Sequence, residues 1–136
     1  MSQVFPARSW VASANGHADF PLQNLPLGVF SVDGGTPRSG VAIGDHVFDL
    51  QAALQAGLFD GAAREAVEAM SGGQLNAFFE LGRNARVALR ERLLALLGED
   101  SAQREQILAQ GAKMLPLATD CQMHLPAKIN DYTDFY

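Results

Sequence analysis

Cysteine is nearly absent from this chain of 136 residues, in which Cys121 is the single example. One cysteine excludes a disulfide framework and a zinc site built from several thiolates. Positive charge is scarce as well, since 10 lysines and arginines face 15 aspartates and glutamates, for a formal net charge of -5. The basic residues form no cluster, and we therefore expect no nucleic-acid partner.

Long hydrophobic runs are also missing. No apolar stretch approaches the roughly 18 residues of a membrane-spanning helix, and the N-terminal residues lack the apolar segment of a secretory signal. We therefore expect no membrane partner and a cytoplasmic location. The composition that remains, 48% hydrophobic and 18% charged, is typical of a globular domain and argues against disorder.

The N-terminal part of the chain, up to residue 50, carries strand and turn signals. Prolines prevent long regular elements before residue 27, and the apolar residues between them predict an arm that lies against a core. Alternating apolar residues then predict three strands, at residues 28–32, 39–43 and 46–50. Gly44 and Asp45 have the order typical of a two-residue turn between antiparallel strands. Three pairs of side chains are expected to face the core: Phe30 with Val32, Val41 with Ile43, and Phe48 with Leu50.

Residues 51–111 are predicted to be helical, with glycines as breaks between the helices. The expected helices cover residues 50–56, 60–70, 74–81, 85–97 and a last segment that ends at residue 110. Caps are expected from three residues: Asp49, Asn84 and Asp100. Arg86, Arg90 and Arg92 on the longest helix are expected to form a solvated face.

Few residues before the C-terminal end could carry chemistry. The separations of His17, His46 and His124 match no metal-binding motif, so we expect structural or solvent-exposed roles for them. Cys121 follows Asp120 and has no neighbouring base or helix start that would activate its thiol, which predicts an inert side chain. No glycine-rich segment has the spacing of a phosphate-binding loop.

The last residues of the chain, DYTDFY at positions 131–136, combine carboxylates with aromatic rings. In an extended segment Asp134 lies on the same face as Tyr132 and Tyr136, an arrangement that suits a hard metal or a polar ligand. One carboxylate is too few on its own, because Ca2+ takes about six to eight oxygen ligands. Aspartates that organise a turn without a metal stay an alternative. The aromatic rings fit either a partner surface or a C-terminal strand folded back on the core.

Three ordered segments resemble the fumarylacetoacetase family. The first segment matches the start of that family and consists of DFPLQNLPLGVFS (19–31), GVAIGD (40–45) and DL (49–50). The second, LNAFFELG (75–82), matches the family's LN-x-F-x-x-LG pattern. The third, MHLPA (123–127) followed by DYTDFY (131–136), matches the family's DYTDFY run. Residues 57–73 and 99–121 resemble the family only in their general kind of residue and contain none of the matching motifs. Two positions depart from the family: Asn130 replaces a usual glycine, and Arg86 replaces a frequent tryptophan.

The resemblance implies an α+β fold, with a small SH3-like β-barrel and several helices, followed by an extended C-terminal segment. It places an N-terminal SH3-like domain at residues 1–118. Residues 119–136 are then a linker and the start of a catalytic domain whose remainder lies beyond the chain. That domain is an expected partner, and a homodimer is expected for the full enzyme.

The chemistry implied by the resemblance is hydrolysis of the carbon–carbon bond of 4-fumarylacetoacetate to fumarate and acetoacetate, in tyrosine and phenylalanine catabolism. By resemblance, Asp134 is one of four carboxylate ligands of a divalent metal, Ca2+ or Mg2+, and Tyr136 contacts the substrate. The metal stabilises the charge that develops on the diketone, and a positioned base activates water. The family's general base and other ligands lie beyond residue 136, so no catalytic residue is assigned and the chain alone is predicted to be inactive.

Two other readings stay open on the sequence. The chain could be a stand-alone interaction module whose aromatic end docks on a partner. It could also be an α+β domain without a surviving function. A module freed from catalysis has no chemical need for Asp134 and Tyr136, and their presence favours the enzyme part.

Overall fold

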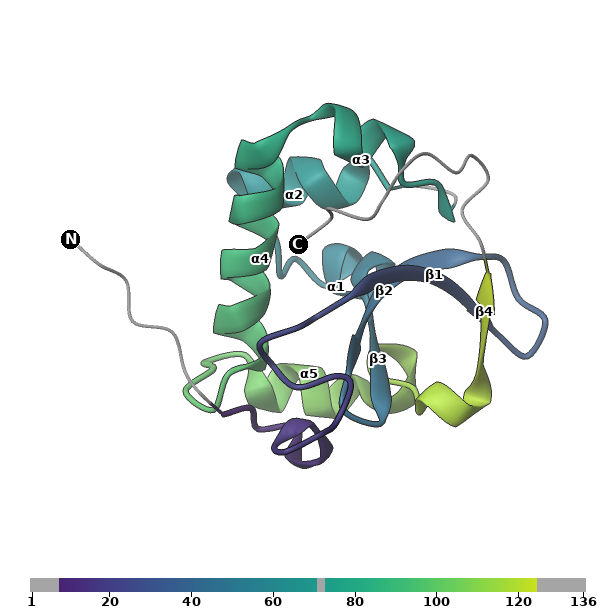
Figure 1. The fold of residues 1–136 in the computed structure, drawn as a ribbon, viewed down its shortest axis with the longest axis vertical. Coiled ribbons are helices and arrows are strands. Elements are labelled where there is room, and N and C mark those ends of the chain that lie inside the picture. The colour runs from purple at the N-terminus through teal and green to yellow at the C-terminus, as the bar shows by residue number, and fades with distance from the viewer. Residues whose placement is uncertain (1–7, 71–72, 125–136) are drawn as a thin grey trace.

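The computed structural model describes residues 8–70 and 73–124, which form an α+β fold with one antiparallel sheet and helices around it (Figure 1). The strands are β1 (Leu27–Val32), β2 (Arg38–Ile43), β3 (His46–Asp49) and β4 (Cys121–His124). The α-helices are α1 (Leu50–Gln55), α2 (Gly61–Glu68), α3 (Asn76–Glu80), α4 (Arg83–Leu97) and α5 (Arg104–Gln110). Short 3-10 turns are η1 (Ala12–Ala14), η3 (Gly111–Lys113) and η4 (Ala118–Asp120).

The sheet has the order β3-β2-β1-β4, with every neighbouring pair antiparallel. The three predicted strands are confirmed, each with ends within one residue of those expected. Gly44 in the β2–β3 turn has a φ of 56°, a conformation that glycine adopts without a Cβ penalty. β4 is an addition to the prediction, because it returns from the far end of the chain to pair with β1.

A closed SH3-like barrel is not confirmed. Within the described residues the sheet is open, since β3 and β4 are its two edges and do not pair with each other. The β3 side is joined to the chain before η4 by an isolated bridge between His46 and Leu117. Backbone hydrogen bonds from the Val47 amide to the Pro116 carbonyl and from the Asp49 amide to the Met114 carbonyl accompany it. The coarser prediction of an α+β fold is confirmed. In the part of the chain that the structure describes, no strand pairing closes the sheet into a barrel.

Both faces of the sheet are covered, which changes the simple alternation expected for β1. Val29, Phe30 and Ser31 are all buried, whereas Val32 is only half-buried. The Phe30 ring occupies the space beside Gly40, where an added Cβ would lie 2.7 Å from Phe30 Cε1. A strand buried on both faces loses the alternation of buried and exposed residues. The predicted core positions on β2 and β3, together with Leu50, are confirmed as fully buried.

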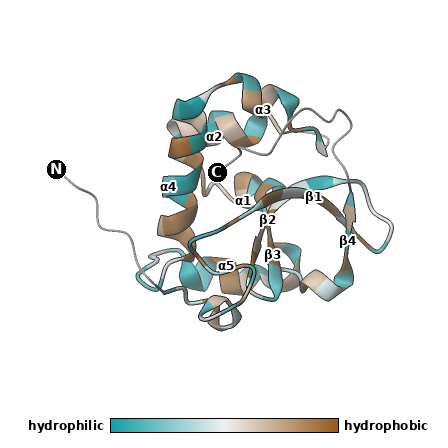
Figure 2. Ribbon diagram, viewed as in Figure 1, coloured by the Kyte–Doolittle hydropathy of each residue, from teal (hydrophilic) through white to brown (hydrophobic). Residues whose placement is uncertain are grey.

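The helices pack on one another and on β2 to form the main core. α2 packs against α4, and α1 contacts both β2 and α2. The buried positions of α4 recur at helical spacing: Ala85, Leu89, Leu93, Leu94, Leu96 and Leu97. Figure 2 shows the resulting hydrophobic and hydrophilic bands along α4. Among residues 8–70 and 73–124, no helix combines the length and the apolar character of a membrane span.

One of the three predicted helix caps is confirmed. The Asp49 carboxylate accepts a hydrogen bond from the Ala52 amide at the start of α1. The caps predicted at Asn84 and Asp100 are wrong, because α4 begins at Arg83 and α5 at Arg104 without a side-chain cap. Gly82, with a φ of 87°, turns the chain directly from α3 into α4 and so moves the start of the helix.

The predicted solvated arginine face is wrong for two of its three members. Arg90 donates to the backbone carbonyls of Gln23 and Asn24, and Arg92 Nε donates to the Leu58 carbonyl at 2.7 Å. Both arginines are half-buried. They join α4 to the N-terminal arm and to the segment before α2, because long side chains can lie along a surface while the guanidinium finds acceptors.

The N-terminal arm lies against the core, as predicted, with Leu22 and Leu25 fully buried. Its first described residues also pack on the end of α4. Ser9 Oγ donates to the Leu97 carbonyl, and Trp10 Nε1 donates to the Leu96 carbonyl at 2.9 Å. The last carbonyls of a helix have no partner within the helix. The arm supplies donors for two of these carbonyls and fixes its own position at the same time.

Candidate functional site

The residues to which the resemblance assigns chemistry lie at the C-terminal end of the chain. Asp134, the predicted metal ligand, and Tyr136, the predicted substrate contact, are outside the described residues. The same holds for the rest of the DYTDFY run and for Asn130. The two assignments therefore stay predictions. The nearest described element is the strand that precedes these residues in the sequence.

That strand is β4, which ends at His124, seven positions before Asp131. β4 pairs with β1 so that His124 lies opposite Val29 and Gln122 lies opposite Ser31. The Ser31 hydroxyl lies 2.6 Å from His124 Nε2, and Ser31 is 2% exposed. This partly buried polar contact fixes the end of β4 on the sheet, so the last described residue has a defined position.

The described residues do not provide a site for the expected Ca2+ or Mg2+. Among residues 8–70 and 73–124, no group of three or more histidine, cysteine, aspartate or glutamate side chains is placed to hold a metal ion. Hard divalent cations need several oxygen ligands. Asp134 is the one carboxylate that the resemblance assigns to the metal in this chain, and further ligands would have to come from elsewhere.

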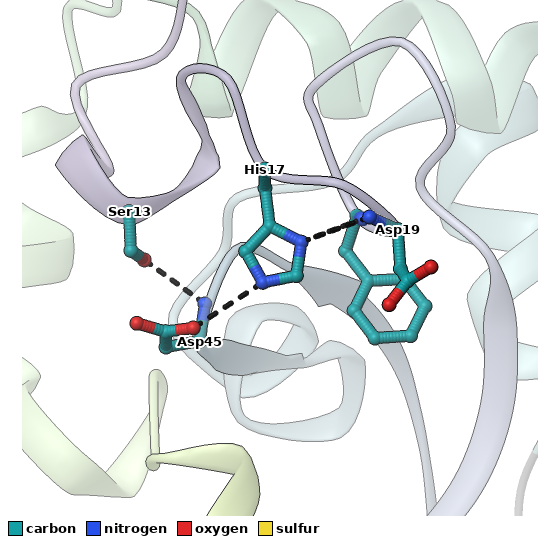
Figure 3. A network of polar contacts seen from close by, with 5 residues as sticks. Ser13, His17, Asp19 and Asp45 are labelled. Carbon is teal, nitrogen blue, oxygen red and sulfur yellow. Dashed lines mark hydrogen bonds and ion pairs between the residues drawn. The ribbon is translucent and has the colours of Figure 1, made fainter.

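A second cluster of polar residues surrounds His17 (Figure 3). His17 Nδ1 accepts hydrogen bonds from the backbone amides of Asp19, at 3.1 Å, and Phe20, at 2.9 Å. With Nδ1 acting as an acceptor, Nε2 carries the proton toward Asp45 Oδ1 at 3.2 Å. The ring also stacks on Phe20, with 5.6 Å between centroids.

This cluster contains a serine, a histidine and an aspartate but lacks the geometry of a catalytic triad. In a triad the imidazole must reach the serine hydroxyl. Here Ser13 Oγ accepts from the backbone amide of Asp45 at 2.9 Å, and the His17 ring bonds to the Asp45 carboxylate instead (Figure 3). The cluster ties η1 and the N-terminal arm to the β2–β3 turn, which confirms the structural role predicted for His17.

The remaining histidine and the cysteine have backbone partners. His46 Nδ1 lies 3.2 Å from the Leu115 carbonyl. Cys121 Sγ donates to the Leu117 carbonyl at 3.3 Å, and the side chain is half-buried. Burial and the negative charge of Asp120 and Asp49 raise the pKa of the Cys121 thiol. A thiol kept protonated is a weak nucleophile, in agreement with the predicted inert side chain.

An ion pair between β2 and β3 was missed at the sequence level. Arg38 Nε lies 2.9 Å from Asp49 Oδ2, and the Asp49 side chain is 6% exposed. Burial raises the pKa of Asp49, against the opposing effects of the Ala52 amide and the Arg38 cation. The two-residue turn at Gly44 could have revealed the pair. It sets the register so that Gly40 lies opposite Asp49, and Arg38 then stands on the same face two positions before Gly40.

Comparison with known proteins decides the family. The family model described as "Fumarylacetoacetase N-terminal" matches residues 23–126, most of the chain. The chain belongs to the fumarylacetoacetase N-terminal family. The match confirms the family inferred from the three ordered segments, and it includes the four strands and five α-helices found in the described residues.

Relatives from distant organisms agree with this family. Fumarylacetoacetase of Caenorhabditis elegans is 44% identical over 122 residues, which cover 88% of this chain and 29% of that protein. Fumarylacetoacetase of Oryza sativa subsp. japonica is 40% identical over 135 residues, or 96% of this chain and 31% of that protein. The human fumarylacetoacetase is 40% identical, with coverage of 88% and 28%. The chain therefore spans less than a third of the length of the curated relatives it matches.

Proposed function

We propose that this chain is the N-terminal part of a fumarylacetoacetase, an enzyme that hydrolyses the carbon–carbon bond of 4-fumarylacetoacetate. The observation that carries the proposal is the family match over residues 23–126, together with 40–44% identity to proteins of that name. The DYTDFY run at residues 131–136 lies just past the matched segment and supports the same reading. The comparisons lend no support to a stand-alone interaction module.

The described residues form a domain, and its last strand precedes the residues that we assign to the reaction site. β4 is held on β1 by its ladder and by the Ser31–His124 contact. Residues 125–136 start from that fixed point. In the proposed enzyme Asp134 is one ligand of Ca2+ or Mg2+, and Tyr136 contacts the substrate. Three further carboxylates and the general base would come from outside this chain.

Several finer features belong to the same proposal. We propose that the sheet is completed toward an SH3-like barrel and that the catalytic domain begins near residue 119. We also propose the catalytic domain and a second copy of the enzyme as partners, and a cytoplasmic location. The chain alone is expected to have no turnover, because one carboxylate is too few for a divalent metal and no general base is assigned.

The proposal is tested with a chimera that joins this chain to the part of the Caenorhabditis elegans fumarylacetoacetase that follows its matched segment. We expect the chimera to hydrolyse fumarylacetoacetate and the 136-residue chain alone to be inactive. The worm segment alone is the control for residual activity. A folded chimera without activity, or turnover by the isolated chain, would contradict the proposal.

A further inference from the structure

A cavity with both charged and apolar walls lies where the end of β1 and the start of β2 meet α1 and η3. Its volume is about 770 Å3, within the ~300–1,000 Å3 range common for small-molecule sites. Of the described residues that line it, three are charged: Arg38, Asp49 and Lys113. We call this cavity the Arg38 hollow. The described residues that line it, from Val32 to Pro116, all precede in sequence the run to which the proposed hydrolase chemistry belongs.

The charges in the Arg38 hollow leave an excess of positive charge. Asp49 uses one carboxylate oxygen to accept from the Ala52 amide and places the other 2.9 Å from Arg38 Nε. Within the described part of the chain, the two terminal amino groups of Arg38 have no hydrogen-bond or ion-pair partner. Lys113 is exposed and is likewise without such a partner among those residues.

The Asp49 contact also holds the guanidinium in place. Asp49 is buried and is tied to the first turn of α1, so its contact with Nε limits the orientations of Arg38. A guanidinium whose two terminal amino groups stay available can bind a carboxylate through paired hydrogen bonds. The ordering of this side chain is therefore achieved before a ligand arrives, which lowers the entropic cost of binding.

The other walls of the hollow are amide and apolar. Gln55 and Gln110 contribute side-chain amides, while Val32, Ala52 and Pro116 contribute hydrocarbon surface. An inorganic anion would leave the hydrocarbon surface unused. A small organic acid would use both kinds of wall, and its single negative charge would match the net charge of Arg38, Asp49 and Lys113.

We propose that the Arg38 hollow binds a small organic monocarboxylate. The carboxylate lies between Arg38 and Lys113, and the carbon body packs toward Val32 and Pro116. The proposal does not rest on the hydrolase activity, because none of the described residues that line the hollow has an assigned role in that chemistry.

The test is a 1H–15N NMR titration of the 136-residue chain, whose dispersed spectrum first shows that it is folded. The probes share one carbon skeleton: butyrate, 1-butanol and butylamine, with inorganic phosphate as the anion without a carbon body. We expect saturable shifts around Arg38, Ala52 and Lys113 with butyrate at millimolar levels, and much weaker binding of the others. Phosphate binding as tight as butyrate, shifts elsewhere, or no saturable shift would overturn the proposal.

Three variants locate the site. Lys113→Gln should weaken butyrate binding about two- to fivefold, the range for an exposed charge contact. Arg38→Lys keeps a cation beside Asp49 but loses the planar fork, and should weaken binding on the order of tenfold. Arg83→Gln removes an exposed cation at the start of α4, outside the hollow, and should leave binding unchanged. If Arg38→Lys does not fold, Lys113→Gln against Arg83→Gln still decides, and equal affinities in the two would overturn the proposal.

Discussion

Ser31 and His124 are 93 positions apart in the chain, yet the Ser31 hydroxyl lies 2.6 Å from His124 Nε2. The contact joins the middle of the sheet to the last residue of β4. β4 is only four residues long and forms an edge of the sheet, so its ladder offers few hydrogen bonds. The Ser31–His124 contact is therefore expected to contribute a large share of what holds this strand.

Removal of the Ser31 hydroxyl tests that expectation. Ser31→Ala should lower the free energy of unfolding by about 1 kcal/mol, the usual net value of one hydrogen bond. It should also speed amide hydrogen exchange at residues 121–124 more than in β2 and β3. Denaturant unfolding and exchange mass spectrometry measure the two effects.

Ser39 provides a matched control for this variant. Ser39 is 1% exposed and lies in the neighbouring strand, but its hydroxyl has no hydrogen-bond partner among the residues that the structure describes. Ser39→Ala should be neutral or slightly stabilising, within about 0.5 kcal/mol, because an unpaired buried hydroxyl gives no bond to lose. Equal losses in the two variants would show that the Ser31–His124 contact has no special role.

The buried Asp49 predicts a pH dependence of stability. Burial raises its pKa in the folded chain above the ordinary value of 3.8. At pH values between 3.8 and the raised pKa of the folded chain, the folded state binds more protons than the unfolded state. The contribution of Asp49 to the unfolding free energy therefore falls as the pH rises. Asp49→Asn should remove this contribution, since an amide can still accept from the Ala52 amide but does not titrate.

The measurement is denaturant unfolding of wild type and Asp49→Asn at several pH values from 3 upward, with 3.8 as the lower edge of the window. The unfolding free energy of wild type relative to the variant should decrease with rising pH and then level off. A difference that increases with rising pH would mean that the Arg38 cation outweighs burial, contrary to the expected direction of the shift.

Gly44 is the glycine that the fold can least replace. Its φ is 56°, and an added Cβ would lie 2.3 Å from Ser13 Oγ and 2.6 Å from the Ala14 nitrogen. Gly44→Ala should therefore lose about 1–2 kcal/mol for the backbone conformation and about 1–3 kcal/mol more for the overlap with η1. Thermal unfolding of the variant measures the loss.

Gly57 separates the two causes. Gly57 has a φ of 78°, but apart from its two chain neighbours no described residue has an atom within 4 Å of the added Cβ. Gly57→Ala should show the backbone cost alone, about 1–2 kcal/mol. If the two variants lose the same stability, then η1 yields to the new methyl group and the close approach of the N-terminal arm is not a constraint.

The first strands and most helices could be predicted because their signals are local. The alternation in β2 and the Gly44 turn lie within a few residues of one another, and Asp49 caps a helix that starts at the next position. The Asn84 cap failed because the left-handed Gly82 ends one helix and starts the next. β4 could not be predicted, since Cys121–His124 has no alternation and its strand state depends on pairing with β1.

The candidate site was less predictable from local sequence patterns than the strands and helices were. Asp134 and Tyr136 were assigned by resemblance, and spacing alone left an ordinary aspartate turn as an alternative. The Arg38–Asp49 pair depends on a hairpin register that the turn sets, so it was within reach of sequence reasoning. The Ser31–His124 contact was not, because it joins segments 93 positions apart.

The roles of Asp131 and Asp134 can be separated in the chimera proposed above. Asp134→Asn should abolish hydrolysis of fumarylacetoacetate and lower the bound Ca2+ or Mg2+, because an amide is a poorer ligand for a hard cation. Asp131→Asn, in the same run, should retain more activity and its metal. Metal analysis by mass spectrometry accompanies the assay, and equal metal content in both variants would contradict the assignment of Asp134.

If this chain is the first part of a longer hydrolase, the remainder of the enzyme is encoded after it. The most direct measurement is to read the transcript of its gene past the Tyr136 codon. We expect the frame to continue into a segment that supplies the general base and the carboxylates that complete the metal site. A stop codon directly after Tyr136, with no second chain that supplies those carboxylates, would contradict it.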